Sequence, residues 1–124
     1  MNASSFLKKC EARSAWYWSR SRKILLDGQP VDFASHPYQV EPMKDRSPRQ
    51  CAMKGAQIGW TSISLLRTIH GLLHGYYPQG CLYLFPSRED TTDFSKARFN
   101  PLIKDNPSIA TNVQNTDAAS SCEA

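Results

Sequence analysis

The arrangement of apolar residues between positions 49 and 85 restricts the possible folds more than any other feature of the sequence. Within 61–74, apolar residues recur at steps of three and four positions, at Ile63, Leu66, Ile69 and Leu73. This spacing predicts a helix with one apolar face. A short apolar run precedes the helix (49–54) and another follows it (81–85). Strands joined through a helix pair in parallel, so we expect an α/β fold with two buried strands in a parallel sheet.

Local signals place further elements on both sides of this unit. We expect a helix over 5–26, a turn over 27–30, an extended piece over 31–35, a short helix over 38–44 and a helix over 88–99. Pro37 suits the first position of the short helix, and Ser87 with Asp90 forms a capping box for the last one. We therefore divide the chain into an N-terminal helical segment (1–30), an α/β domain (31–105) and a polar tail expected to be disordered (106–124).

Length and composition limit the classes of protein. A chain of 124 residues with 40% hydrophobic and 21% charged residues is long enough for one globular core. We find no apolar run of the length that a membrane span needs and no signal-peptide pattern, so we expect a cytoplasmic protein without a membrane partner. The cysteines lack the spacing of a metal or redox pair, and we expect them to be reduced: Cys10, Cys51, Cys81 and Cys122.

The N-terminal segment is basic and contains aromatic residues. Over 8–23, six cations stand against Glu11 alone, with three aromatic residues among them: Lys8, Lys9, Arg13, Arg20, Arg22, Lys23, Trp16, Tyr17 and Trp18. Such a segment either grips phosphates and stacks on bases, or forms a helix whose aromatic rings pack inward while its cations face water. The sequence leaves both interpretations open.

The segment from Lys54 to Ser62 lies where a phosphate-binding loop would lie, between an expected strand and an amphipathic helix. The usual loop has the pattern G-x-x-x-x-G-K-[ST]. Gly59 matches its second glycine and Thr61 its hydroxyl, but Trp60 replaces the lysine and Lys54 the first glycine. On its pattern alone, the segment fails as a phosphate loop. Lys54 is then a solvated cation and Thr61 a plain helix cap.

This segment nevertheless resembles the variant phosphate loop of the phage terminase large subunit, the ATPase and nuclease that packages DNA into phage heads. Some members of that family carry the lysine at the start of the loop and an aromatic residue before the Thr/Ser position. The flanking segments resemble the family in the same order: Phe33–Gln39, Leu82–Arg88 and Asp93–Leu102. The resemblance covers roughly 20–115 and implies a partial P-loop NTPase fold.

The resemblance also implies roles for individual residues toward ATP and Mg²⁺. Lys54 would reach the β- and γ-phosphates, the backbone of the loop would cradle them, and Thr61 would bind Mg²⁺. Tyr38 would stack on adenine, with Gln39 as an edge contact. The cradle consists of Gly55, Ala56, Gln57, Ile58 and Gly59.

The family further implies double-stranded DNA, the terminase small subunit and the portal as partners, in the cytoplasm of a bacterial host. After Phe85 we find no other apolar strand that ends in Asp or Glu, and no nuclease carboxylates. We therefore expect an N-terminal fragment with weak nucleotide binding and negligible ATP turnover. The alternatives are a nucleic-acid or partner-binding module without a nucleotide site, based on 8–23, and an inert prophage remnant.

Overall fold

The computed structural model describes residues 2–113, which are mostly helical. The elements, in chain order, are α1 (Ala3–Arg13), α2 (Ala15–Ser21), β1 (Leu25–Leu26), β2 (Gln29–Pro30), η1 (Pro37–Gln39), α3 (Val40–Lys44), α4 (Trp60–Leu73), α5 (Arg88–Phe94), η2 (Ser95–Phe99), α6 (Asn100–Asp105) and α7 (Pro107–Ala110). None of the described helices is long and apolar enough to cross a membrane.

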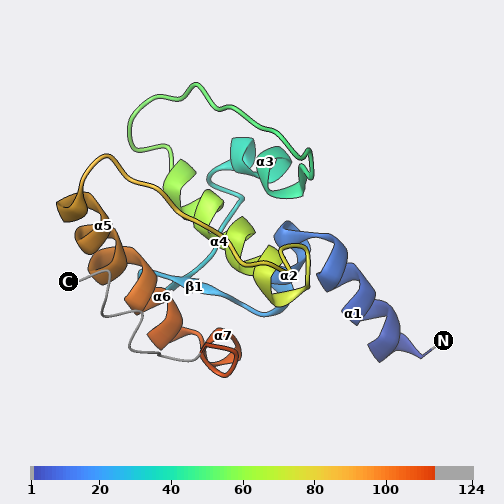
Figure 1. Cartoon of the computed structure of the whole chain (residues 1–124). Helices are drawn as coiled ribbons and strands as arrows, with labels where there is room; N and C mark the ends of the chain where they lie inside the picture. Colours follow the sequence, from blue (N-terminus) through green and yellow to red (C-terminus); the bar gives the residue numbers. More distant parts are fainter. Residues whose placement is uncertain (1, 114–124) are drawn as a thin grey trace.

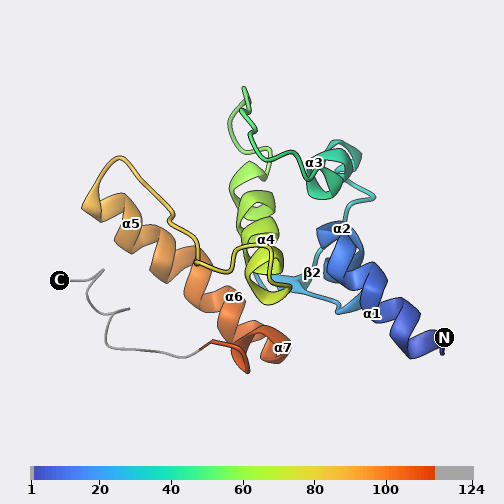
Figure 2. The same ribbon diagram turned by 45° about the vertical axis from the view of Figure 1, so that its right-hand side comes forward.

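Helix α4 runs through the middle of the molecule. Helices α1 and α2 lie on one side of it, α3 lies beside its N-terminal half, and α5, η2 and α6 form a rod on the other side (Figures 1 and 2). The apolar face predicted for 61–74 faces the core, which contains Ala15, Trp18, Ile24, Phe33, Met43, Ile63, Leu65, Leu66, Ile69, Leu102 and Ile109. The helix ends at Leu73, with His74 as its C-cap residue and Gly75, with a φ of 76°, directly after it. The sequence therefore predicted this helix and its end correctly.

The predictions of a parallel α/β sheet and of a partial P-loop NTPase fold are wrong. The one sheet in the described part of the chain is a two-stranded antiparallel hairpin, in which Leu25 faces Pro30 and Leu26 faces Gln29. Asp27 and Gly28 both adopt positive φ, which is the geometry of a tight turn between twisted strands. The turn of this hairpin lies within the turn that the sequence predicts at 27–30.

The two segments expected to be buried strands are extended but unpaired. Residues 51–57 are exposed throughout, and Met53 is fully exposed. In 81–85 the side chains alternate: the rings of Tyr83 and Phe85 pack against Phe94, while Leu82 and Leu84 are exposed. An apolar run becomes a strand only when another strand offers hydrogen bonds, and neither segment has such a partner within residues 2–113.

The described cysteines are reduced, as the sequence predicts, but two of them are exposed rather than buried. Cys10, Cys51 and Cys81 are free thiols, as expected. Cys51 and Cys81 are exposed, because the segments that carry them are not buried strands. Cys122 lies outside the described residues.

The N-terminal segment forms two helices rather than one helix over 5–26. Ser14 has extended backbone angles, and its hydroxyl accepts a hydrogen bond from the Tyr17 amide, so it caps α2 and interrupts the helix. Trp18 and Ala15 of α2 are buried, whereas Phe6 and Leu7 of α1 are exposed.

The helical rod after Ser87 extends beyond the predicted 88–99. Ser87 caps α5 by accepting a hydrogen bond from the Asp90 amide, as the capping box predicts. The chain then passes through a π-helical turn, η2, and continues as α6 to Asp105. Pro101 has no amide to donate to the carbonyl of Ala97, one turn earlier, so the regular hydrogen-bond pattern cannot pass through this point. Residues 106–113, expected to be disordered, contain α7 with Ile109 in the core.

The buried side chain of Asn106 joins the hairpin to the rod. Its Oδ1 accepts from the Leu25 amide at 2.7 Å, and its Nδ2 donates to the carbonyls of Leu25 and Leu102 at 2.9 and 2.8 Å. Asn106 is 4% exposed, so these hydrogen bonds take the place of hydrogen bonds to water at the backbone amide and carbonyl of Leu25.

We predict that Asn106→Ala lowers the free energy of unfolding by about 2–4 kcal/mol, because it leaves buried backbone groups without hydrogen-bond partners. Urea unfolding followed by circular dichroism measures this loss. Asn112→Ala is the control, because the Asn112 amide is exposed and bonds only to Ser108 and Thr111. Equal effects of the two substitutions would contradict the role assigned to Asn106.

A polar and aromatic cluster attaches α1 and α2 to α4. The buried ring of His70 donates through Nε2 to the Glu11 carbonyl at 2.7 Å and packs against Trp18. The Glu11 carboxylate accepts from Ser21 and pairs with Arg22 at 2.9 Å. Burial raises the pKa of Glu11, but the bonds from Ser21 and Arg22 outweigh it and lower the pKa overall.

We predict that stability falls as the pH drops from about 7.5 to about 5.5, because burial lowers the pKa of His70 below its ordinary 6.5. In this window the unfolded chain binds a proton that folded His70 does not bind, so acid favours unfolding. The lowered pKa of Glu11 acts only below 4.5, outside the window. Thermal unfolding at both pH values should show a smaller drop for His70→Gln than for the exposed control His36→Gln. A full drop in His70→Gln would exclude His70 as the cause.

Candidate functional site

The N-terminal end of α4 is the strongest candidate for binding an anion. Gly59 precedes the helix with a left-handed φ of 76°, and Gln57 is also left-handed. No side chain among the described residues caps this end, and the first turn contains no acidic residue. The helix dipole and its free amides therefore favour a negative charge here.

Two residues from the segment before α3 hold the loop that leads into α4. Gln39 donates through Nε2 to the Ile58 carbonyl at 2.9 Å, and the Tyr38 hydroxyl donates to the same oxygen at 3.2 Å. A Cβ on Gly59 would lie 2.6 Å from Gln39 Nε2, so this approach requires glycine. The structure thus brings together three of the predicted residues, although 19 and 20 positions separate Gln39 and Tyr38 from Ile58.

A pocket of about 320 Å³ opens beside this contact. It lies between residues 30–36, the loop 57–59 and the first turns of α4, and apolar side chains of Phe33, Ile63 and Leu66 line its depth. This volume is at the lower end of the range for small-molecule sites. The segment that resembles the family's adenine-contacting region and the segment that resembles its phosphate loop therefore border one pocket.

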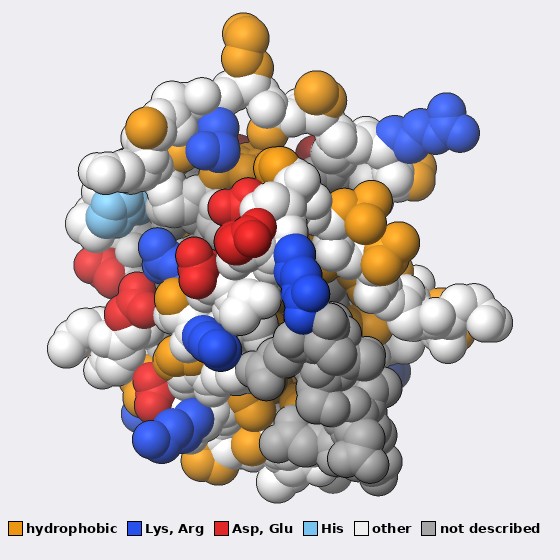
Figure 3. All heavy atoms as spheres, turned by 60° about the vertical axis from the view of Figure 1, so that its left-hand side comes forward, with side chains coloured by type: hydrophobic (Ala, Val, Ile, Leu, Met, Phe, Trp, Pro, Cys, Tyr) orange, Lys and Arg blue, Asp and Glu red, His pale blue; other side chains and the backbone are white. Residues whose placement is uncertain are grey.

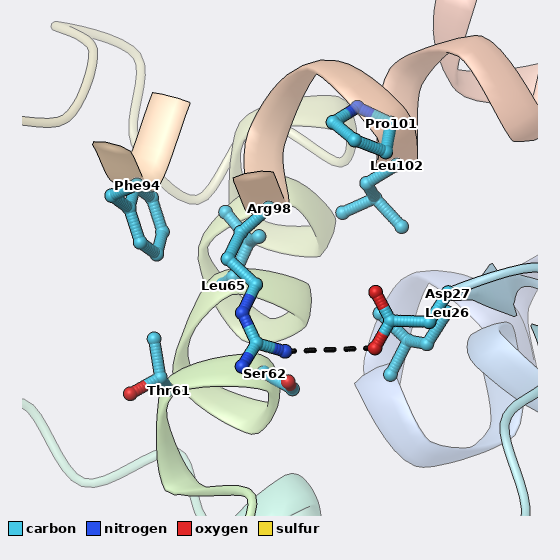
Figure 4. Close-up of a pocket in the computed structure, with 9 residues that line it drawn as sticks. All are labelled: Leu26, Asp27, Thr61, Ser62, Leu65, Phe94, Arg98, Pro101 and Leu102. Atoms are coloured by element: carbon cyan, nitrogen blue, oxygen red, sulfur yellow. Dashed lines mark ion pairs between the residues drawn. The ribbon is translucent and has the colours of Figure 1, made fainter. Parts of the chain in front are cut away.

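Other predicted residues lie outside this pocket. Lys54 is exposed, and its ammonium group makes one long contact of 3.5 Å with the Gly55 carbonyl. Gly55 and Ala56 are also exposed. Thr61 borders a separate narrow cavity, together with Phe94 and Arg98 (Figure 4). The structure does not bring Lys54 and Thr61 together around the pocket.

Ser62 and Asp27 are site residues that the sequence analysis missed. Ser62 borders both cavities, because one helical step turns it from the Thr61 side toward the pocket. Asp27 reaches the narrow cavity from the hairpin and pairs with Arg98 of η2 at 3.5 Å (Figure 4). Ser62 follows Thr61 and was detectable from its place in the first turn. Nothing local to Asp27 indicates that the hairpin lies against α4.

The aromatic residues of the basic N-terminal segment pack inward. Trp18 is 4% exposed, and the centre of the Trp16 ring lies 4.8 Å from the Arg20 guanidinium and 4.6 Å from the Lys44 ammonium group. These two rings are therefore engaged within the protein. Of the two interpretations left open by the sequence, the structure favours inward-packed rings with solvated cations.

A comparison with family models identifies the protein family of the chain. The model described as "Phage terminase large subunit gpA, ATPase domain" matches residues 27–123. The chain belongs to this terminase family. The matched range contains the loop, the pocket and α4, and it begins after α1 and α2. No curated protein and no solved structure matches the chain. Membership of an ATPase-domain family implies that a nucleotide is used.

We predict that Gly59→Ala destabilises the terminase chain more than Gly75→Ala. Both glycines have a φ of 76°, so both substitutions carry the same backbone penalty, but a Cβ meets no atom within 4 Å at Gly75. The extra loss should be about 0.5–1.5 kcal/mol, the value of the Gln39–Ile58 hydrogen bond that must break. Urea unfolding measures both variants. Equal losses would contradict the close approach at Gly59.

Proposed function

We propose that this chain binds ATP with Mg²⁺ at the loop 54–59 and the N-terminal end of α4, as the ATPase domain of a DNA-packaging terminase. The observation that carries the proposal is the uncapped, glycine-led end of α4, which lies beside a pocket within the range matched by the terminase ATPase family. The chemistry of this end fits a polyphosphate, because backbone amides and the helix dipole favour anions.

Each residue of the loop has a part in this proposal. Gly55, Ala56, Gln57, Ile58 and Gly59 supply backbone amides to the phosphates. Lys54 supplies a positive charge from its exposed, unrestrained position. The hydroxyls of Thr61 and Ser62 are the candidate ligands for Mg²⁺, which neutralises charge on the phosphate oxygens when bound.

Tyr38 and Gln39 position the loop and face the base. Both donate to the Ile58 carbonyl, so they fix the turn that precedes the left-handed Gly59. Tyr38 is 52% exposed and leaves a ring surface open for adenine, and Gln39 lines the pocket. We assign stacking to Tyr38 and an edge contact to Gln39.

The wider assembly also belongs to the proposal. In terminases of this family, ATP hydrolysis drives double-stranded DNA into the capsid together with the small subunit and the portal. Within the described residues no strand carries an acid to orient the attacking water, so the activity proposed for this chain is nucleotide binding, with little turnover.

Calorimetric titration with ATP and Mg²⁺ tests the proposal. We predict that Lys54→Ala weakens binding by about 1–3 kcal/mol, since it removes a contact to a charged group, and that a Thr61→Ala/Ser62→Ala double variant weakens it comparably. Lys104→Ala is the matched control, because Lys104 is an exposed cation of α6 that lines neither the pocket nor the narrow cavity.

The outcomes separate the proposal from its alternatives. Binding that Lys54→Ala and the double variant reduce, but Lys104→Ala does not, supports the site. Folded wild-type chain without affinity for ATP, or affinity that no variant changes, contradicts it.

A further inference from the structure

A second pocket lies beside the middle and C-terminal half of α4, at Arg67 and His70. It has a volume of about 290 Å³ and is lined by side chains from the end of α1, the turn after α3, the side of α4 and the segment after α4. The charged and aromatic residues that matter here are Arg13, Arg46, Arg67, Asp45, Tyr76 and Tyr77. None of these residues was singled out by the phosphate-loop analysis.

The pocket contains more positive than negative side chains. Arg13, Arg46 and Arg67 come from three different segments, and none forms an ion pair with a carboxylate within residues 2–113. The acidic residue of the pocket, Asp45, accepts from the hydroxyl and the amide of Ser47 at 2.6 and 2.9 Å. These bonds lower the pKa of Asp45. Its carboxylate is thus engaged locally, and the three guanidinium groups exceed it in charge.

Two of the arginines are held in place. Arg46 lies 4.1 Å from the centre of the Tyr76 ring, and its Nη1 donates to the Arg13 carbonyl at 3.4 Å. Tyr76 is in turn fixed by its hydroxyl, which donates to the Ala12 carbonyl at 2.6 Å. Arg67 donates to the Gln50 side chain at 2.7 Å and to the Asp45 carbonyl at 2.8 Å. Each guanidinium group carries five N–H donors, so both retain donors for a ligand.

We propose that this arginine pocket binds a phosphate group of a nucleic-acid backbone. Guanidinium groups match phosphate oxygens with paired donors, and fixed guanidinium groups lose little freedom on binding. The proposal does not depend on the nucleotide site, from which the pocket shares no residue.

The surroundings favour a polymer of phosphates over a single anion. Lys44 is the chain neighbour of the pocket residue Asp45, and Trp16 is the chain neighbour of the pocket residue Ala15. Lys44 and Arg20 lie 4.6 and 4.8 Å from the centre of the Trp16 ring. Consecutive phosphates can therefore meet cations beyond the pocket itself. In contrast, the face that carries α5 and α6 shows acidic and basic side chains interspersed (Figure 3).

The test is the affinity of the full chain for a short fluorescent DNA duplex, measured by anisotropy over a series of salt concentrations. We expect Arg46→Gln and Arg67→Gln each to weaken binding about tenfold and to reduce the salt slope by about one unit, as loss of one phosphate contact does. Lys96→Gln and Lys104→Gln are matched controls on the rod, since they remove the same charge outside the pocket.

Two further measurements make the outcome decisive. Circular dichroism tests whether each variant is folded. Arg13→Gln tests the third arginine of the pocket, whose side chain holds no loop in place. Inorganic phosphate is titrated in parallel. Loss of duplex binding confined to the arginine variants supports the proposal. Duplex binding that falls equally in the lysine controls, or phosphate binding without duplex binding, overturns it.

Discussion

Burial of α4 is the interaction on which the rest of the structure depends. Leu66 is fully buried at the middle of the helix, and Ile63, Leu65 and Ile69 continue the same face. The other core residues come from α2, α3, α6, α7 and the segment 24–33, and they pack in one cluster with this helix. Gly71 shows how close the packing is, because a Cβ there would overlap the ring of Tyr77. Side chains of α4 line both the pocket at its N-terminal end and the arginine pocket, so neither pocket would form without this helix.

The sequence predicted the parts of the fold that local chemistry decides. The helix over 61–74, the capping box at Ser87 and the turn at Asp27 depend on spacing, side-chain hydrogen bonds and tolerance of positive φ, all of which neighbouring residues supply. The parallel sheet was wrong because pairing between strands depends on distant residues. The run 81–85 has the alternation of a strand with one covered face, which apolar composition alone cannot distinguish from a paired strand.

In the candidate site, too, the sequence predicted what neighbouring residues decide and missed what the packing of distant elements decides. The resemblance of the loop predicts a phosphate-binding segment before α4, and the contacts of Tyr38 and Gln39 with Ile58 bring the two predicted regions together. Sequence reasoning could not place Asp27 against α4 or collect three arginines into one pocket, because both arrangements arise from the packing of separate elements. Ser62 was open to prediction, since every helical first turn presents more than one residue to its N-terminal side.

The most direct test of the central claim is the change in amide chemical shifts when ATP and Mg²⁺ are added to isotopically labelled chain. The account predicts that the largest changes occur at the amides of Gln57 to Ser62, the loop and first turn of α4, with smaller ones near Gln39. Changes confined to the segments around Arg46 and Arg67, or an unaltered spectrum of the folded chain, would contradict the claim that the N-terminal end of α4 is the nucleotide site.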